Sequence, residues 1–170
     1  GFTYQYYELN ALLAEYTALL EKHPDHSLEI VGVPCNQFAR QEPGANRSEI
    51  LNSLRYARPG NGFIPLFSLS GKVEVNGPNE TPLYSFLKES CPEAPDTNIG
   101  DPHDLFWTPL ASTDIRWNFE KFIIDSHGKP RYRIDRSVGP TEIHGFLNEV
   151  IQAPGDTNYL DDLLNEVFGS

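Results

Sequence analysis

The sequence contains few residues that could form disulfides or bind a metal. Among its 170 residues there are two cysteines, Cys35 and Cys91, and they do not form a CxxC pair. Two cysteines are too few for a disulfide framework or a four-ligand metal site. The five histidines are scattered, and none has the spacing of metal ligands. We therefore predict no metal centre, and the cysteine count leaves the redox compartment open.

Long apolar runs and basic residues are also scarce. No window approaches the roughly 18 consecutive apolar residues of a membrane helix, so we predict no membrane span. The chain has 13 Lys and Arg against 24 Asp and Glu, and its net charge of -11 would repel a polyphosphate, which excludes nucleic acid as a partner. Residues 137–170 hold no Lys or Arg at all. With 39% apolar residues, the chain can form one globular domain with a single core.

Hydrophobic spacing and capping signals predict two helices and a strand in the first third of the chain. Apolar residues recur at helical spacing over 4–22, and the pattern stops at a His-Pro pair. The apolar run 28–33 predicts a buried strand. Asn46 stands three residues before Glu49, which is the arrangement of a capping box, and therefore predicts a helix over 47–57.

The middle of the chain alternates between loops and short elements. A stretch rich in Gly, Pro and Asn from 59 to 82 leaves room for one short strand. Pro82 follows an N-cap threonine and predicts the start of a third helix. Residues 91–114 hold four prolines and predict a long irregular loop. Apolar runs at 119–125 and 131–134 flank a Gly-containing turn and predict a hairpin.

The C-terminal region divides into a last helix of the domain and an acidic tail. Pro140 opens a predicted helix that carries apolar residues to position 151. We therefore assign residues 1–152 to one α/β domain. Residues 153–170 form an acidic tail, which is predicted to be helical because its leucines, Val167 and Phe168 fall on one face.

Four short stretches, spread over almost the whole chain, carry a family resemblance. They are Gly1-Phe-Thr with Tyr7-Glu-Leu-Asn, Val33-Pro-Cys-Asn-Gln-Phe-Ala-Arg-Gln-Glu-Pro-Gly, Arg58-Pro-Gly-Asn-Gly-Phe, and Trp117-Asn-Phe-Glu-Lys-Phe. In this order and spacing they are similar to the glutathione peroxidase family, whose fold is α/β and thioredoxin-like. The resemblance implies that fold for residues 1–152.

The family's nucleophile is implied to lie just outside this sequence. In that family a selenocysteine or cysteine ends a strand, directly precedes the glycine that matches Gly1, and attacks the peroxide oxygen. The resemblance therefore implies that the chain is a fragment, lacking its natural N-terminus, its N-terminal strands and its nucleophile. We expect the missing residue to be selenocysteine, whose UGA codon is easily taken for a stop, and we expect no other cofactor.

Three side chains match the family's other catalytic residues: Gln41, Trp117 and Asn118. The attacking selenolate or thiolate is an anion and needs hydrogen-bond donors around it. Two amides and an indole N–H can donate without competing for the proton. From the residue types alone, the favoured interpretation is a buried aromatic anchor for Trp117 and loop capping for the two amides.

Glutathione carries two carboxylates, so its site requires cations. Arg58 matches a glutathione-contacting arginine of the family, and Arg133 and Arg136 fall where the family places a further pair. Arg40 stands where relatives have a basic or imidazole side chain. Each one alone could be a solvated surface charge, so the prediction rests on the cluster. Gln5 stands where some intracellular relatives have an arginine, which puts that contact in doubt.

The reductant is predicted from a cysteine that is absent. Relatives that use thioredoxin carry a resolving cysteine in the segment that matches 55–65, and this chain has none there. Glutathione is therefore the expected co-substrate. Cys35 ends an apolar run with no neighbouring cation or histidine, so we interpret it as a buried, inert thiol.

A long insert over 77–113 resembles the tetrameric members of the family, which implies a homotetramer. Within it, Leu87-Lys-Glu-Ser-Cys-Pro resembles the plasma, secreted branch, so we expect secretion, with a cytoplasmic location as the alternative. The sequons at Asn46 and Asn79 are compatible with secretion but are close to the number expected by chance.

The resemblance implies a peroxidase that reduces hydrogen peroxide and small organic hydroperoxides with glutathione. The alternative is a pseudoenzyme or an assembly subunit that keeps the donors without a nucleophile. The codon before Gly1 separates the two hypotheses, because UGA or a cysteine codon supports the enzyme and any other codon supports the alternative.

Overall fold

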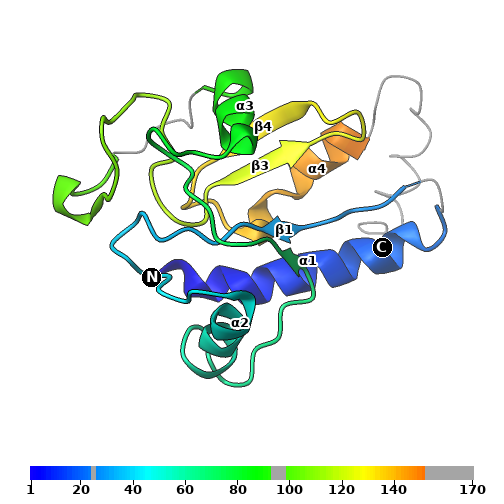
Figure 1. Cartoon of the computed structure of the whole chain (residues 1–170). Helices are drawn as coiled ribbons and strands as arrows, with labels where there is room; N and C mark the ends of the chain where they lie inside the picture. Colours follow the sequence, from blue (N-terminus) through cyan, green and yellow to red (C-terminus); the bar gives the residue numbers. More distant parts are fainter. Residues whose placement is uncertain (24–25, 93–98, 152–170) are drawn as a thin grey trace.

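The structure, a computed structural model, describes residues 1–23, 26–92 and 99–151 (Figure 1). Helices alternate with two small sheets along these ranges, so the architecture is mixed α/β. One sheet pairs β1 (Val31–Gly32) with β2 (Ser68–Leu69) in parallel. In the other sheet, β3 (Lys121–Ile124) and β4 (Pro130–Ile134) are antiparallel.

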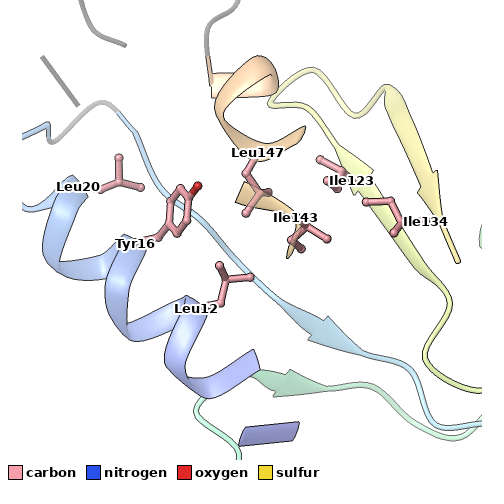
Figure 2. Packing of buried hydrophobic residues seen from close by; sticks show 7 residues of the cluster. All are labelled: Leu12, Tyr16, Leu20, Ile123, Ile134, Ile143 and Leu147. Carbon is pink, nitrogen blue, oxygen red and sulfur yellow. The ribbon is translucent and has the colours of Figure 1, made fainter. Parts of the chain in front are cut away.

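The first long helix, α1, confirms the predicted helix over 4–22. It runs from Gln5 to Leu20 behind a short 3-10 turn, η1 (Phe2–Tyr4). Its buried apolar residues Leu12, Tyr16 and Leu20 recur four apart, and the buried Gln5 lies seven positions before Leu12, so all four fall on one face. Figure 2 shows this face packed against apolar side chains from β3, β4 and the last helix. The cluster consists of Leu12, Tyr16, Leu20, Ile123, Ile134, Ile143 and Leu147.

The predicted buried strand over 28–33 is much shorter and less buried in the structure. Only Val31 and Gly32 join a ladder, and Val31 is 56% exposed. In the described part of the chain, β1 has one strand partner, β2, so its other edge carries no ladder. Ile30 is half-buried and packs against two of the apolar clusters. Within residues 28–33, exposed and half-buried residues are mixed, and none is fully buried.

The second helix, α2 (Arg47–Tyr56), starts where the capping signal predicted. Asn46 Oδ1 accepts a hydrogen bond from the Glu49 N–H across 3.0 Å. The Glu49 carboxylate in turn accepts from the Ala45 N–H and from Nδ2 of Asn46. Reciprocal bonds of this kind satisfy donors that a helix start leaves free.

The third helix, α3 (Pro82–Ser90), also begins at the predicted proline. Thr81 occupies the N-cap position, although its side chain makes no capping hydrogen bond. In the described part of the irregular loop over 91–114, the regular structure is one 3-10 turn, η2 (Pro102–Asp104). In Figure 1, α1 runs along the lower side of the strands and α3 lies at the top of the view.

The predicted hairpin is present as β3 and β4, which the turn after Asp125 connects. Asp125 Oδ1 accepts from the backbone N–H groups of His127 and Lys129. Pro140 opens a 3-10 turn, η3 (Pro140–Glu142), and the predicted helix follows as α4 (His144–Ile151). The predicted acidic helix over 153–170 lies outside the described residues, and no helix within them could cross a membrane.

Candidate active site

Gln41 and Asn118, predicted to share a catalytic role, are hydrogen-bonded to each other. Nδ2 of Asn118 donates to Oε1 of Gln41 across 3.1 Å, although the residues are 77 positions apart. Gln41 lies on the loop after β1, and Asn118 lies just before β3. The bond leaves Nε2 of Gln41 and the second hydrogen of Nδ2 of Asn118 for another acceptor.

The loop that carries Gln41 has an unusual backbone. Ala39 and Arg40 both have a φ of 49°, in the left-handed region that non-glycine residues seldom occupy. The N–H of Ala39 donates to the carbonyl of Asp104 across 2.7 Å, and the N–H of Gln41 donates to Phe38 across 3.2 Å. Phe38 is almost fully buried. The loop is thus anchored on both sides of the strained pair.

Trp117 contributes the third predicted donor. Its half-buried ring lies 5.8 Å from the ring of Phe38, measured between centroids. The guanidinium of Arg136 lies over the Trp117 ring, 5.7 Å from the ring centroid. No described residue accepts a hydrogen bond from the indole N–H. The structure therefore brings the two amides into contact, and Trp117 directly precedes Asn118 in the sequence.

The first residues of the chain lie beside this group. The ring of Phe2 is 6.5 Å from that of Phe119, which directly follows Asn118. The same Arg136 that covers Trp117 lies 6.0 Å from the Phe2 ring. Phe2 is therefore close to both Phe119 and Arg136.

The four predicted arginines differ in their exposure to solvent. Arg40 and Arg58 are exposed, Arg136 is half-buried, and Arg133 is buried. Arg136 is half-buried, and its carbonyl accepts a hydrogen bond of 2.7 Å from Nε2 of the fully buried Gln5. Arg40 is exposed and stacks on the Phe106 ring at 4.3 Å. Arg58 is exposed after α2 and makes no recorded contact with Gln41 or its partners within the described ranges.

Arg133 is different, because its side chain is only 1% exposed. Its Nε is paired with the carboxylate of Glu120, itself 2% exposed. The remaining guanidinium nitrogens donate to backbone carbonyls at 2.9–3.2 Å, those of Cys91, Pro92, Thr113 and Asp114. A buried charge must be paired and hydrogen-bonded, and here the partners are internal. We correct the expectation accordingly: Arg133 holds the long insert against β4 and does not face a substrate.

The structure confirms the predicted burial of Cys35. Both cysteines are free. Burial raises the pKa of the Cys35 thiol above its ordinary value, although bonds from backbone N–H groups partly oppose this. A thiol with a raised pKa is a poor nucleophile at neutral pH. Cys91, at the end of α3, is half-buried at the start of the irregular loop.

Sequence reasoning missed two buried amides near the site, Gln37 and Asn76. Gln37 is 4% exposed and Asn76 is fully buried. Each hydrogen-bonds to backbone groups 39 positions away. Buried amides are uncommon without such partners, but composition alone could not name the partners. No group of ligands suited to a metal ion occurs in the part of the chain that the structure describes.

Comparison with known proteins identifies the family of the chain. The family model described as glutathione peroxidase matches residues 1–88. The chain is 46% identical to a glutathione peroxidase of Dirofilaria immitis, over 88% of this chain and 66% of that protein. It is 47% identical to glutathione peroxidase 3 of Caenorhabditis elegans, over 92% of this chain and 67% of that protein. It is 51% identical to rat glutathione peroxidase 3, over 78% of this chain and 55% of that protein.

Two solved structures of other proteins share this architecture. A crystal structure of Trgpx in apo form superposes with a TM-score of 0.56 and 29% identity, covering 91% of this chain and 74% of that one. A crystal structure of T. cruzi GPX1 gives a TM-score of 0.54 at 22% identity, which concerns the fold alone. These neighbours and the arrangement of helices and sheets define a thioredoxin-like α/β fold. The chain belongs to the glutathione peroxidase family, and it spans about half to two thirds of the length of the curated relatives it matches.

Proposed function

We propose that the protein containing this chain reduces hydrogen peroxide and small organic hydroperoxides with glutathione. The observation that carries the proposal is the contact between Gln41 and Asn118, which directly follows Trp117 in the sequence. In the overall reaction the peroxide O–O bond accepts two electrons and becomes an alcohol or water plus one water. Two glutathione thiols supply these electrons and protons and become a disulfide.

The nucleophile in this proposal is a selenocysteine or cysteine directly before Gly1. Cys35 cannot serve, because its thiol is buried and burial raises its pKa. A selenolate or thiolate before Gly1 would lie two positions from Phe2 in the chain, and Phe2 neighbours Phe119 and Arg136. Gln41, Trp117 and Asn118 would then donate hydrogen bonds to the anion and lower its pKa. Amides and indoles do not titrate near neutral pH, so they favour the charged form without taking its proton.

Glutathione is proposed to bind at the arginines that remain open to solvent. Arg136 lies over the Trp117 ring, and Arg40 directly precedes Gln41 in the sequence, with its guanidinium over Phe106. Arg58 completes the proposed set on the strength of the family match. The protein is acidic overall, and these arginines would supply the positive charge that the carboxylates of glutathione require. Arg133 is not part of this proposal.

We further propose secretion and assembly as a homotetramer. Two of the relatives are named glutathione peroxidase 3, which fits the secreted branch expected from the sequence. Within the insert over 77–113 several large apolar side chains are exposed, as an assembly surface requires. They are Leu83, Phe86, Phe106 and Leu110.

The test compares two proteins that carry the natural upstream segment and differ only in the residue before Gly1, cysteine in one and serine in the other. Formation of glutathione disulfide from hydrogen peroxide and glutathione is followed for each. We expect turnover from the cysteine protein alone, because serine supplies no thiolate. A folded cysteine protein without turnover would contradict the proposal and favour a non-catalytic pseudoenzyme or assembly subunit.

A further inference from the structure

The side chain of Gln37 pairs with the backbone of one distant residue, Asn76. Its Nε2 donates to the Asn76 carbonyl across 2.8 Å, and its Oε1 accepts from the Asn76 N–H across 3.1 Å. The same oxygen also accepts from the Val75 N–H at 2.9 Å. A single side-chain amide thereby satisfies both backbone groups of a residue, as a neighbouring strand would.

The side chain of Asn76 repeats this arrangement one step further along. Its Nδ2 donates to the Ile115 carbonyl across 2.8 Å, and its Oδ1 accepts from the Ile115 N–H across 2.8 Å. The ammonium of Lys88 also reaches Oδ1 at 3.4 Å. The two amides therefore act in series, from the loop after β1, through Val75-Asn76, to the segment before β3.

The ends of this series lie next to the two halves of the candidate site. Gln37 is four residues before Gln41, and the turn between them is closed by the Gln41 N–H on Phe38. Ile115 is two residues before Trp117 and three before Asn118. Gln41 and Asn118 come from segments 77 positions apart, so something must hold their relative position.

We propose that Gln37 and Asn76 are positioning residues that set Gln41 against Trp117 and Asn118. Apolar side chains of the same size would fill the space, but they would not fix the register of one backbone segment on the next. Each amide has its donor and its acceptor satisfied, so the pair is rigid and costs little desolvation. The consequence for catalysis rests on the proposed function.

The test uses Gln37→Met and Asn76→Leu in the protein with its upstream segment and cysteine before Gly1. Asn10→Leu is the matched control, because Asn10 also bonds a carbonyl and an N–H of a distant segment, those of Ile64 and Leu66. If an apolar variant does not fold, Asn76→Asp replaces it. That variant keeps the acceptor for Ile115 beside Lys88 and loses only the donor. High-resolution crystal structures give the distance from Asn118 Nδ2 to Gln41 Oε1, and stopped-flow measurements give the rate constant with hydrogen peroxide.

In the Gln37 and Asn76 variants we expect the distance to exceed the 3.5 Å limit of a hydrogen bond and the rate constant to fall about tenfold to a hundredfold. Asn10→Leu should lower thermal stability and leave both quantities unchanged. In a Gln41→Ala background, Gln37→Met should cause no further loss of rate. An unchanged distance and rate in Gln37→Met, with only a lower melting temperature, would overturn the inference. A lengthened distance in a protein whose parent shows no turnover would instead refute the proposed function and leave the positioning role standing.

Discussion

Asn118 donates a hydrogen bond to Gln41 across 3.1 Å, and this contact joins the two halves of the candidate site. The bond fixes the orientation of both amides, because the acceptor must be the oxygen of Gln41 and the donor the nitrogen of Asn118. The amide nitrogen of Gln41 therefore remains a donor.

The buried ion pair of Arg133 with Glu120 predicts a large stability effect. Arg133→Met should lower the free energy of unfolding by about 3–5 kcal/mol, because it leaves Glu120 as an unpaired buried charge. Arg131→Met is the matched control on the same strand. Arg131 is 43% exposed and pairs with Asp125 at 3.3 Å, so its loss should change stability by no more than about 1 kcal/mol. Urea unfolding measures both, and similar small changes would contradict the structural role of Arg133.

A functional effect is expected instead from Arg136. Arg136→Leu should raise the KM for glutathione about tenfold, because a carboxylate partner is lost, while the rate constant with hydrogen peroxide changes little. Arg131→Leu should leave both unchanged. Steady-state kinetics with varied glutathione makes the comparison. An unchanged KM in Arg136→Leu would remove this residue from the proposed glutathione site.

The thiol of Cys35 should be unreactive in the folded chain. Burial disfavours the thiolate and raises the pKa, so the thiolate fraction at pH 8 stays below that of an exposed cysteine. Titration with a disulfide reagent should find two free thiols per 170-residue chain in urea without reductant. In the native state Cys35 should react slowly. Fast native labelling of Cys35, or no free thiol in urea, would contradict the structure.

Stability should rise with pH in a defined window because of Lys121. Burial lowers the pKa of its ammonium from 10.5 to about 8, although nearby carboxylates, Asp135 first among them, oppose the shift. Between these values the unfolded chain binds more protons than the folded chain, so raising the pH favours folding. Below pH 8 this contribution is constant.

The measurement for Lys121 is urea unfolding at pH 7.5, 8.5 and 9.5, below the range in which tyrosines of the unfolded chain ionise. The parent should gain stability over this range relative to Lys121→Met. Lys129→Met, at an exposed turn position, should follow the parent. If Lys121→Met follows the parent as well, the ammonium of Lys121 does not have a lowered pKa.

The local features of the fold could be predicted from the sequence because their causes are local. The apolar spacing of α1, the Asn46 cap of α2 and the turn between β3 and β4 each depend on residues within a few positions of one another. The run over 28–33 could not be predicted in the same way. Its burial depends on which strands lie beside it, and in the described part of the chain β1 pairs with β2 alone.

The residues of the site, like the elements of the fold, could be predicted only in part from the sequence. The family motifs indicated Gln41, Trp117 and Asn118, and the structure brings Gln41 and Asn118 into contact. The sequence could not separate Arg133 from Arg136. Which of them is buried depends on Glu120, across the hairpin, and on carbonyls of the insert.

The roles of the buried amides also depend on contacts between residues far apart in the sequence. Gln37 and Asn76 each bond to a segment 39 positions away, and neither the motif around Cys35 nor local spacing could reveal the partners. A buried amide has to be paired, but its partner is fixed by the tertiary structure.

The central claim is that Gln41, Trp117 and Asn118 stabilise an anionic nucleophile beside Gly1. The pH dependence of alkylation tests it most directly, in protein that carries cysteine before Gly1, because iodoacetamide reacts with the thiolate. Mass spectrometry of the N-terminal peptide separates this cysteine from Cys35 and Cys91. The account predicts a midpoint clearly below the pKa of about 8.5 of an ordinary cysteine, and a return toward that value in a Gln41→Leu, Asn118→Leu double variant. The same midpoint in the parent and the double variant would contradict the claim.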